Sequence, residues 1–370
     1  MKEAIYSIAL TRIPKIGAIR AKRLLDVAGS AIFLFENVEL LVEQDEFPLA
    51  LVPELQNKSL IEAAESMVTR MLDLGVEMVP YSSSKYPSRL KECVDAPIIL
   101  FYKGIVPLNR PHVISIVGTR HITEYGRRMC NQIVQDLKSF DPTILIVSGL
   151  AYGVDVQSHR AALSEGLDTV GILAHGLDKI YPAANRRTAE EMMLKGGVLT
   201  EYLLDTEPDR FNFVSRNRII AGMSDATIIV ESACKGGSLI TADLANSYDR
   251  DCFAVPGRVG EEYSVGCNDL IKNNKAAMIE SGFDVVNMLQ WTNSPRKNTS
   301  KISSSPLAKY SSLSGVELDI VHLLITKNNQ QVDDLLQSLD IPINQLHAIL
   351  FQLEMQGILE AKAGGMYSLV

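Results

Sequence analysis

Residues 112–290 alternate short apolar and β-branched runs with stretches of helical pattern. Nearly every residue at 144–147 and 227–230 is apolar or β-branched, which is typical of strands buried on both faces of a parallel sheet. The helical stretches between the runs would supply the crossovers, so we predict an α/β domain with a doubly wound, mostly parallel sheet. The predicted strands are 113–117, 144–147, 169–173, 198–200, 226–230 and 252–254, and the predicted helices are 124–139, 155–165, 184–194, 215–223 and 238–248.

The segments on either side of this alternation have other patterns. Residues 1–80 have a helical pattern, and the connection that follows, to about residue 110, is rich in proline. Residues 291–315 are rich in Ser and Lys and cannot bury enough apolar surface to offset their ordering entropy, which is typical of a linker. Residues 316–370 predict three helices and a terminal hairpin, hence a winged helix. We therefore predict a helical domain (1–80), the α/β domain (81–290), the linker (291–315) and the winged helix (316–370).

Composition narrows the class of protein. The chain has 370 residues, of which 46% are apolar and 22% charged, as in an ordinary globular protein. We expect neither a membrane span nor a signal peptide, because the apolar runs are too short and no cleavage site of small residues follows residues 1–10. The five cysteines form no C-x-x-C pair, which argues against disulfides and zinc and favours the cytoplasm. The net charge of −8 requires any polyanion site to be a local basic pocket.

Two loops after predicted strands carry residues suited to an anion. Gly118-Thr119-Arg120 ends the strand 113–117, and Ser148-Gly149 ends the strand 144–147. Ligands of open α/β sheets lie beyond the strand carboxyl ends, where loops and helix N-termini offer N–H donors, and an Arg fork suits phosphate. These loops match neither the dinucleotide, the P-loop nor the serine-hydrolase pattern.

Other short motifs have more than one interpretation. Residues 13–25 resemble a helix–hairpin–helix element that exposes N–H groups to a phosphate, with Lys15 in place of its first Gly; the alternative is an ordinary turn. Asp155 and His159, at i and i+4, are suited to a metal ion in principle. We favour a capping Asp and a packed His, and we expect no metal and no cofactor.

Two later segments place arginines near aromatic residues. Asn185-Arg186-Arg187 follows Tyr181, and Phe213 precedes Arg216-Asn217-Arg218 at a predicted helix start. Guanidinium forks and an amide, with Phe213 and Tyr181 available to stack, suit a nucleic-acid backbone and unpaired bases. The alternative is an internal salt-bridge hub, and we expect one of these arginines, with Arg218 as the candidate, to pair with Glu201 or Glu231.

In this order, these motifs resemble those of the DNA-processing protein A (DprA/Smf) family over roughly 80–290. The resemblance implies an extended Rossmann-like domain that binds single-stranded DNA, forms a homodimer and loads RecA recombinase onto the DNA in natural transformation and recombination. Val214 replaces a Pro of the family motif, and Lys275-Ala276 stands where the family often has Gly-Ala. The motifs that carry the resemblance are Gly118-Thr119-Arg120, Ser148-Gly149, Asp155 with His159 and Arg160, Gly176-Leu177-Asp178, Tyr181-Pro182, Asn185, Phe213-x-x-Arg216-Asn217-Arg218, Gly237-Ser238 and Ala254-Val255-Pro256-Gly257. The candidate DNA-binding residues are Gly118, Thr119, Arg120, Ser148, Gly149, Asn185, Arg186, Arg187, Phe213, Arg216, Asn217, Arg218, Gly237 and Ser238.

A non-catalytic binding protein is the leading interpretation. The alternative is an enzyme, because related Rossmann-like proteins hydrolyse nucleoside monophosphates with a P-G-G-x-G-T-x-x-E loop. The nearest stretch, 235–243, lacks the third Gly and the final Glu. A pure protein-interaction scaffold would leave the Gly and Arg loops unexplained.

Two surfaces are expected to contact protein. We predict the homodimer interface around 238–275, where Leu239, Ile240, Leu244 and Leu270 offer apolar side chains, unless these merely cover the sheet. The predicted third helix of the winged helix, 343–356, has no Lys or Arg, and 316–370 carries two lysines against seven acidic residues. Such a module would repel a duplex, so we expect it to contact another protein or to dock within the chain itself.

Overall fold

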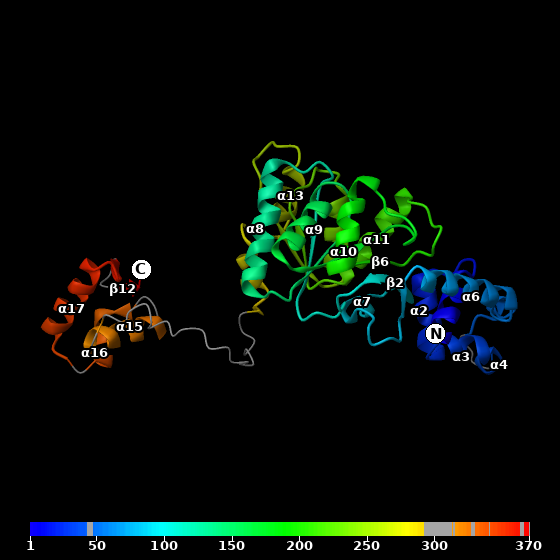
Figure 1. Ribbon diagram of the computed structural model, residues 1–370, viewed down its shortest axis with the longest axis horizontal. Helices are drawn as coiled ribbons and strands as arrows, with labels where there is room; N and C mark the ends of the chain where they lie inside the picture. The colour runs from blue at the N-terminus through cyan, green and yellow to red at the C-terminus, as the bar shows by residue number, and fades with distance from the viewer. Residues whose placement is uncertain are drawn as a thin grey trace. The chain divides into compact units, whose positions relative to one another are not determined.

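The computed structural model describes residues 1–42, 47–291, 313, 315–326, 330–339, 341–362 and 366–369. The chain divides into two compact units, Met1–Ser294 and Pro295–Val370 (Figure 1). No helix among the described residues is long and apolar enough to cross a membrane. All five cysteines are free thiols, and only Cys234 is exposed.

A nine-stranded sheet forms the centre of the first unit, in the order β1-β2-β6-β5-β4-β3-β7-β8-β9. Strand β2 is antiparallel to both of its neighbours, and the pairs from β6 to β9 are parallel. The sheet is therefore mostly parallel, as the sequence predicts. Its strands are β1 (Glu77–Pro80), β2 (Ile99–Gly104), β3 (Val113–Val117), β4 (Leu145–Ser148), β5 (Asp168–Ile172), β6 (Gly197–Thr200), β7 (Ala226–Ile229), β8 (Asp251–Ala254) and β9 (Ala277–Met278).

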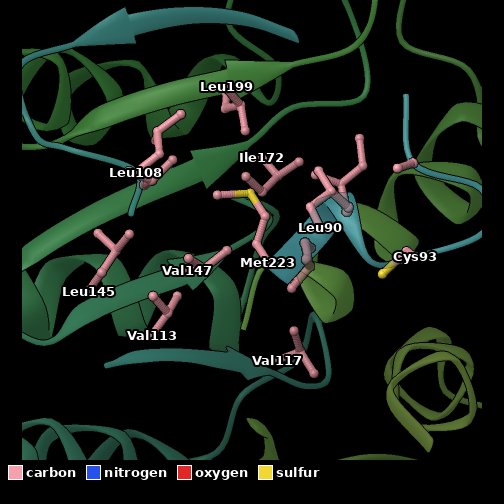
Figure 2. Packing of buried hydrophobic residues seen from close by; sticks show 14 of the residues in the cluster. Leu90, Cys93, Leu108, Val113, Val117, Leu145, Val147, Ile172, Leu199 and Met223 are labelled. Atoms are coloured by element: carbon pink, nitrogen blue, oxygen red, sulfur yellow. The ribbon is translucent and has the colours of Figure 1, made fainter. Parts of the chain in front are cut away.

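Helices cover both faces of the sheet because alternate residues of its strands point to opposite sides. Val113 and Val117 of β3 pack into one apolar cluster (Figure 2), and Ile114 and Ile116 pack into another on the opposite face. The first face is covered by α7 (Ser88–Lys91), α11 (Arg210–Gly222), α12 (Gly237–Ser247) and α13 (Val265–Lys272). The second is covered by α8 (Glu124–Phe140), α9 (Val154–Glu165), α10 (Arg186–Lys195) and α14 (Gly282–Met288).

The interpretation of residues 80–110 as a connection was wrong. This segment contributes β2 to the sheet and α7 to its core, and Leu90 and Leu108 are buried against the central strands (Figure 2). Pro97 and Pro107 flank β2 instead of interrupting it, so a proline-rich composition is compatible with a strand here. Strand β1 likewise lies within the segment 1–80, which was predicted to be helical.

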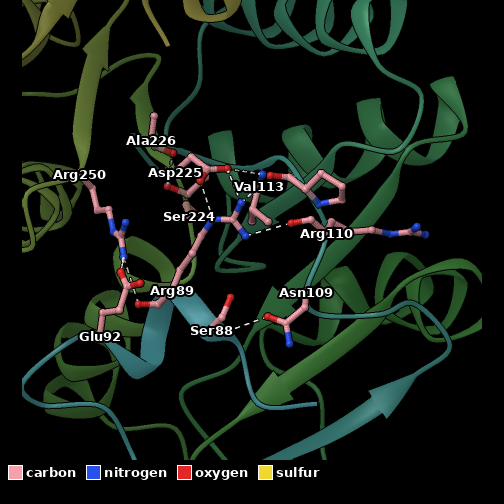
Figure 3. A network of polar contacts seen from close by, with 12 residues as sticks. Ser88, Arg89, Glu92, Asn109, Arg110, Val113, Ser224, Asp225, Ala226 and Arg250 are labelled. Atoms are coloured by element: carbon pink, nitrogen blue, oxygen red, sulfur yellow. Dashed lines mark hydrogen bonds and ion pairs between the residues drawn. The ribbon is translucent and has the colours of Figure 1, made fainter. Parts of the chain in front are cut away.

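Arg89 ties this segment to the start of the central strands (Figure 3). Its guanidinium donates to the carbonyl oxygens of Arg110 and Pro111 and pairs with Asp225, whose Oδ2 also accepts from the Val113 N–H at 2.8 Å. The side chains of Arg89 and Asp225 are 17% and 23% exposed. The pair therefore joins three chain segments, at residues 89, 110–113 and 225, in a largely dry environment.

We expect Arg89→Ala to lower the free energy of unfolding by about 3 kcal/mol, because it leaves the Asp225 carboxylate and two carbonyls without their partner. Urea denaturation measures the change. As a control, Lys85→Ala breaks the exposed Lys85–Glu77 pair and should cost less than about 1 kcal/mol. Equal losses in the two variants would contradict this account of the Arg89 pair.

Helices of the N-terminal segment pack on the sheet through β2. Their core includes Ile99 and Phe101 of that strand. In the segment predicted to be a helix–hairpin–helix, Lys15 has a φ of 66°, the left-handed conformation that favours glycine. These helices are α1 (Lys2–Thr11), α2 (Ala18–Ala28), α3 (Ala31–Glu36), α4 (Val38–Val42), α5 (Val52–Leu55) and α6 (Lys58–Asp73).

The second unit has its own apolar core, which includes Leu324, Leu335, Leu350 and Leu359. Strands β10 (Gln330–Gln331), β12 and β11 form a three-stranded sheet. Three helices and a terminal hairpin are thus present among the described residues of this unit, in the predicted order. Most of the predicted linker, 292–312, lies outside the described residues. The helices are α15 (Val316–Thr326), α16 (Val332–Ser338) and α17 (Ile343–Met355), and the hairpin is β11 (Leu359–Lys362) with β12 (Met366–Leu369).

Candidate nucleic-acid interface

The sheet has a topological switch point beside β3. The chain passes from β3 to its neighbour β4 on one side, and β7 pairs with β3 on the other side. In open α/β sheets, the crevice outside the strand carboxyl ends at such a point is where ligands bind. A recess of about 220 Å³ lies here, and we call it the switch-point recess. Its lining includes Gly118, Thr119, Arg120, Phe213, Arg216, Asn217, Gly237 and Ser238, all of them candidate DNA-binding residues.

Backbone contacts fix the Gly118-Thr119-Arg120 loop at the mouth of the recess. The Thr119 N–H donates to the Glu231 carbonyl at 2.7 Å, and the Thr119 carbonyl accepts from the Val154 N–H at 3.1 Å. Gly153, with a φ of +77°, packs so closely that a Cβ there would lie 2.1 Å from the Thr119 oxygen. The loop therefore has one defined course, and it leaves the Arg120 side chain exposed.

Arg120 stands beside a pair of aromatic rings. Its guanidinium carbon is 5.4 Å from the centre of the Phe213 ring, and the Phe213 and Tyr181 ring centres are 5.8 Å apart. Phe213 is half-buried and Tyr181 is 48% exposed. A cation next to two partly exposed rings combines a phosphate-binding group with a surface on which bases stack.

The arginines of α11 are placed differently from the prediction. Asp209 caps the N-terminus of α11, which begins at Arg210, so Arg216 lies in the middle of the helix instead of at its start. Arg216 is only 3% exposed, and it donates to the Ile172 carbonyl at 2.8 Å, while its Nε has no partner. Arg218 pairs with Glu201, which confirms the expected internal ion pair. Arg218 therefore belongs to the fold, whereas Arg216 forms the floor of the recess.

Several other candidate residues are engaged inside the protein. The Ser148 hydroxyl is buried and donates to the Ile116 carbonyl at 2.6 Å, and the Asn185 amide donates to the Leu150 carbonyl at 2.9 Å. A Cβ on Gly149 would lie 1.7 Å from Arg216 Nη1, so this glycine makes room for the guanidinium. Ser238 donates to the Ser232 hydroxyl at 2.9 Å at the start of α12.

A wider hollow of about 820 Å³ adjoins the recess, and Arg120 lines both; we call it the outer groove. Its lining also includes Arg127, Arg160 and Tyr152, which the sequence-based site omits. Arg127 and Arg160 are exposed, and Tyr152 is 47% exposed. By contrast, Arg186 and Arg187 are exposed on α10 but line neither hollow.

Asp155 and His159 are buried polar groups of α9, and Asp155 lines the switch-point recess. His159 is fully buried, its Nδ1 lies 2.7 Å from the Thr169 hydroxyl, and burial lowers its pKa to about 3. Burial also raises the pKa of Asp155. Among the described residues, no three His, Cys, Asp or Glu side chains form a group that could hold a metal ion. Asp155 lies in the first turn of α9, which begins after Gly153 and shows no side-chain cap.

His159 should make the protein sensitive to acid. Its pKa in the folded state lies below the unfolded value of 6.5, so its stabilising effect is complete above pH 6.5 and is lost as pH falls toward 3. At pH 4 the loss is about 3 kcal/mol. We expect His159→Asn, which does not titrate, to reduce the difference in unfolding free energy between pH 7 and pH 4 by that amount, as measured with urea. If the unfolding free energies of wild type and His159→Asn change equally with pH, His159 is not the source of the acid sensitivity.

A family model described as DNA recombination-mediator protein A matches residues 77–290, which run from the first residue of β1 to the end of the α/β fold. The chain belongs to this family. The DNA processing protein DprA of Streptococcus pneumoniae is 39% identical over 201 residues, which cover 54% of this chain and 70% of the relative. Protein Smf of Escherichia coli is 32% identical over 294 residues, which cover 78% of this chain and 76% of the relative.

Solved structures of family members share the fold. The crystal structure of the S. pneumoniae protein aligns with a TM-score of 0.59 at 31% identity and covers 74% of this chain and 98% of its own. A DprA from Helicobacter pylori aligns with a TM-score of 0.53 at 29% identity and covers 59% of this chain and 96% of its own. The H. pylori protein is described as having a unique single-stranded DNA binding mode.

Proposed function

We propose that this protein binds single-stranded DNA in the outer groove and the switch-point recess. The observation that carries the proposal is the position of Arg120, which lines both hollows and lies over the Phe213 ring. A phosphate at Arg120 would place the neighbouring bases near Phe213 and Tyr181. Partly exposed aromatic rings stack on unpaired bases, and bases paired inside a duplex do not expose their faces, so the arrangement favours a single strand over a duplex.

The local charge of the outer groove also favours a nucleic acid, although the protein as a whole is acidic. The chain has a net charge of −8, yet Arg120, Arg127 and Arg160 all line the outer groove, and none of its described lining residues is acidic. The field within a Debye length decides the attraction of a polyanion, so the groove attracts a phosphate backbone despite the overall charge.

The proposed function is binding without catalysis. In the stretch 235–243, which corresponds to the hydrolase loop, Asp243 is exposed, pairs with Lys275 at 2.9 Å and does not line the recess. A carboxylate placed there cannot orient a water over a ligand in the recess. The experiment is a titration of labelled single-stranded and duplex DNA, together with a nucleoside monophosphate hydrolysis assay. Tighter single-strand binding without hydrolysis supports the proposal, and hydrolysis would overturn it.

We further propose that the protein works in the cytoplasm as a homodimer that protects single strands and loads RecA recombinase onto them in DNA uptake and recombination. The resemblance to the family supports this role. At the expected dimer surface, Leu270 is 5% exposed, Leu239 and Leu244 are half-buried, and Ile240 is 40% exposed. We therefore propose that the dimer contact centres on Ile240 of α12, and light scattering at micromolar concentration tests whether the protein is a dimer.

The second unit is proposed to be a winged helix that contacts protein. The third helix, α17, carries no Lys or Arg, and residues 316–370 have two lysines against seven acidic residues. We expect a chain ending at residue 303 to bind single-stranded DNA within about threefold of the full chain, because phosphate contacts supply most of the affinity. A tenfold loss in a well-folded truncation would show that this unit contacts DNA.

A further inference from the structure

His175 is a buried histidine whose two ring nitrogens both have defined partners. It follows β5 and is 0% exposed. Its Nδ1 lies 2.9 Å from the Gly176 carbonyl oxygen, and its Nε2 accepts from the Tyr181 N–H at 3.2 Å. A carbonyl can only accept and an N–H can only donate, so Nδ1 carries the proton and Nε2 is bare. This pair of bonds requires the neutral imidazole.

The contact with His175 fixes the backbone of Tyr181, whose ring lies against Phe213. The two ring centres are 5.8 Å apart with an angle of 54° between the planes. Tyr181 is 48% exposed, so about half of the residue is accessible to a ligand. The carbonyl of His175 also accepts from the Thr200 hydroxyl at 3.0 Å, which anchors the histidine to β6. Tyr181 is therefore connected to the sheet through the side chain of His175.

We propose that His175 is a positioning residue that holds Tyr181 beside Phe213 as a two-ring subsite for an unpaired base, and that this subsite exists only while the imidazole is neutral. The inference rests on the proposed function, because it names the part of a single strand that this corner of the site takes. Base stacking on aromatic side chains is worth roughly 5- to 100-fold in affinity for each base. Loss of Tyr181 as a stacking partner should thus be measurable.

Protonation of His175 would place a second donor against the Tyr181 N–H. Burial has the largest effect and lowers the pKa of His175; the hydrogen bond to the Gly176 carbonyl and the Asp178 carboxylate act in the opposite direction, and the positive charge of Arg216 adds a smaller lowering. Asp178 is already engaged, since its Oδ1 accepts from the Asp205 N–H at 3.0 Å and its carboxylate pairs with Lys179. The imidazole therefore stays neutral at pH 6.5 and above, and the subsite is lost only when the pH falls below the lowered pKa of His175.

Two substitutions separate the two bonds of His175. His175→Gln places an amide oxygen near the position of Nε2 and keeps an acceptor for Tyr181, whereas His175→Asn keeps a donor near Nδ1 and removes that acceptor. Fluorescence anisotropy would measure the affinity of each variant, and of Tyr181→Ala, for a thirty-residue oligo(dT) and for an abasic oligomer of the same length. At pH 7.5 we expect His175→Asn and Tyr181→Ala to weaken oligo(dT) binding about tenfold. We expect His175→Gln to stay within about threefold of wild type, and all three to bind the abasic oligomer as wild type does.

The pH profile gives a second, independent readout. In wild type the ratio of oligo(dT) to abasic affinity should be constant at neutral pH and fall once the pH drops below the lowered pKa of His175, whereas in His175→Gln it should stay constant throughout. Should His175→Asn fail to fold, this profile and the exposed Tyr181→Ala variant decide the question. Equal ratios at all pH values in wild type, or a Tyr181→Ala variant with unchanged oligo(dT) affinity, would overturn the inference. Arg120→Ala should weaken binding to both oligomers; if it weakens neither, the proposed function itself is wrong.

Discussion

Arg120→Ala should weaken single-stranded DNA binding about tenfold for all base sequences alike, because one charge-assisted contact to a phosphate is lost. The slope of log affinity against log salt should fall by about 0.7, the release expected for one single-strand phosphate contact. The reason lies in the geometry: Arg120 is exposed, lines both hollows and is held by a loop whose course is fixed at Thr119. Anisotropy titrations at several salt concentrations measure both quantities.

Lys138→Ala is the matched control for Arg120→Ala. It removes the same unit of positive charge from the last turn of α8, where Lys138 pairs with Glu165 at 3.6 Å and lines neither hollow. We expect its affinity and its salt slope to equal those of wild type. If both substitutions lower the affinity equally, the effect comes from net charge, and Arg120 has no specific contact.

Gly153→Ala should abolish most of the DNA affinity without a change at any exposed arginine. A Cβ at this position would lie 2.1 Å from the Thr119 oxygen and 2.7 Å from the Arg120 Cα, and both atoms belong to the backbone, which cannot rotate away. The loop must therefore shift, and Arg120 shifts with it. We expect at least a tenfold loss of affinity for oligo(dT), since misplacing Arg120 removes its phosphate contact.

Gly166→Ala separates this clash from simple backbone strain. Gly153 and Gly166 flank the two ends of α9, with φ values of +77° and +74°, but a Cβ on Gly166 would meet no atom within 4 Å. Gly166→Ala should lower stability by about 1 kcal/mol through its left-handed backbone alone, whereas Gly153→Ala should cost more because the clash adds to the positive φ. Only Gly153→Ala should lower DNA affinity, and equal affinities would mean that the loop tolerates displacement.

The strands of the parallel sheet were predictable because burial on both faces leaves a continuous apolar run. The predicted strand 113–117 matches β3. Each of the other five predicted strands differs from the structure by one residue at one end or at both ends. Strand β2 was missed because Pro97 and Pro107 lie on either side of it and gave the segment the composition of a connection. Its partner β6 is also distant in the sequence. Strand β9 has only two residues, both exposed, and leaves no pattern to detect.

The residues of the candidate site were predictable where a loop directly follows a strand. They were less predictable where packing between distant helices determines which residues lie together. Gly118-Thr119-Arg120 was identified correctly because it directly follows the apolar run of the strand 113–117. The start of α11 was placed five residues late, because the cap at Asp209 lies before a segment with weak helical periodicity. Arg127, Arg160 and Tyr152 come together only through the packing of α8 against α9, which no local pattern reveals.

A photocrosslink tests directly whether single-stranded DNA binds in the outer groove and the switch-point recess. The intact protein is crosslinked to a single-stranded oligonucleotide that carries 5-iodouracil, and the adducts are mapped by mass spectrometry. Iodouracil couples to aromatic residues that lie against the base. The account predicts adducts at Phe213 and Tyr181, with Tyr152 as a further site, and a loss of these adducts in Arg120→Ala. Adducts confined to other parts of the chain, such as Phe351 of α17, which is 63% exposed, would contradict it.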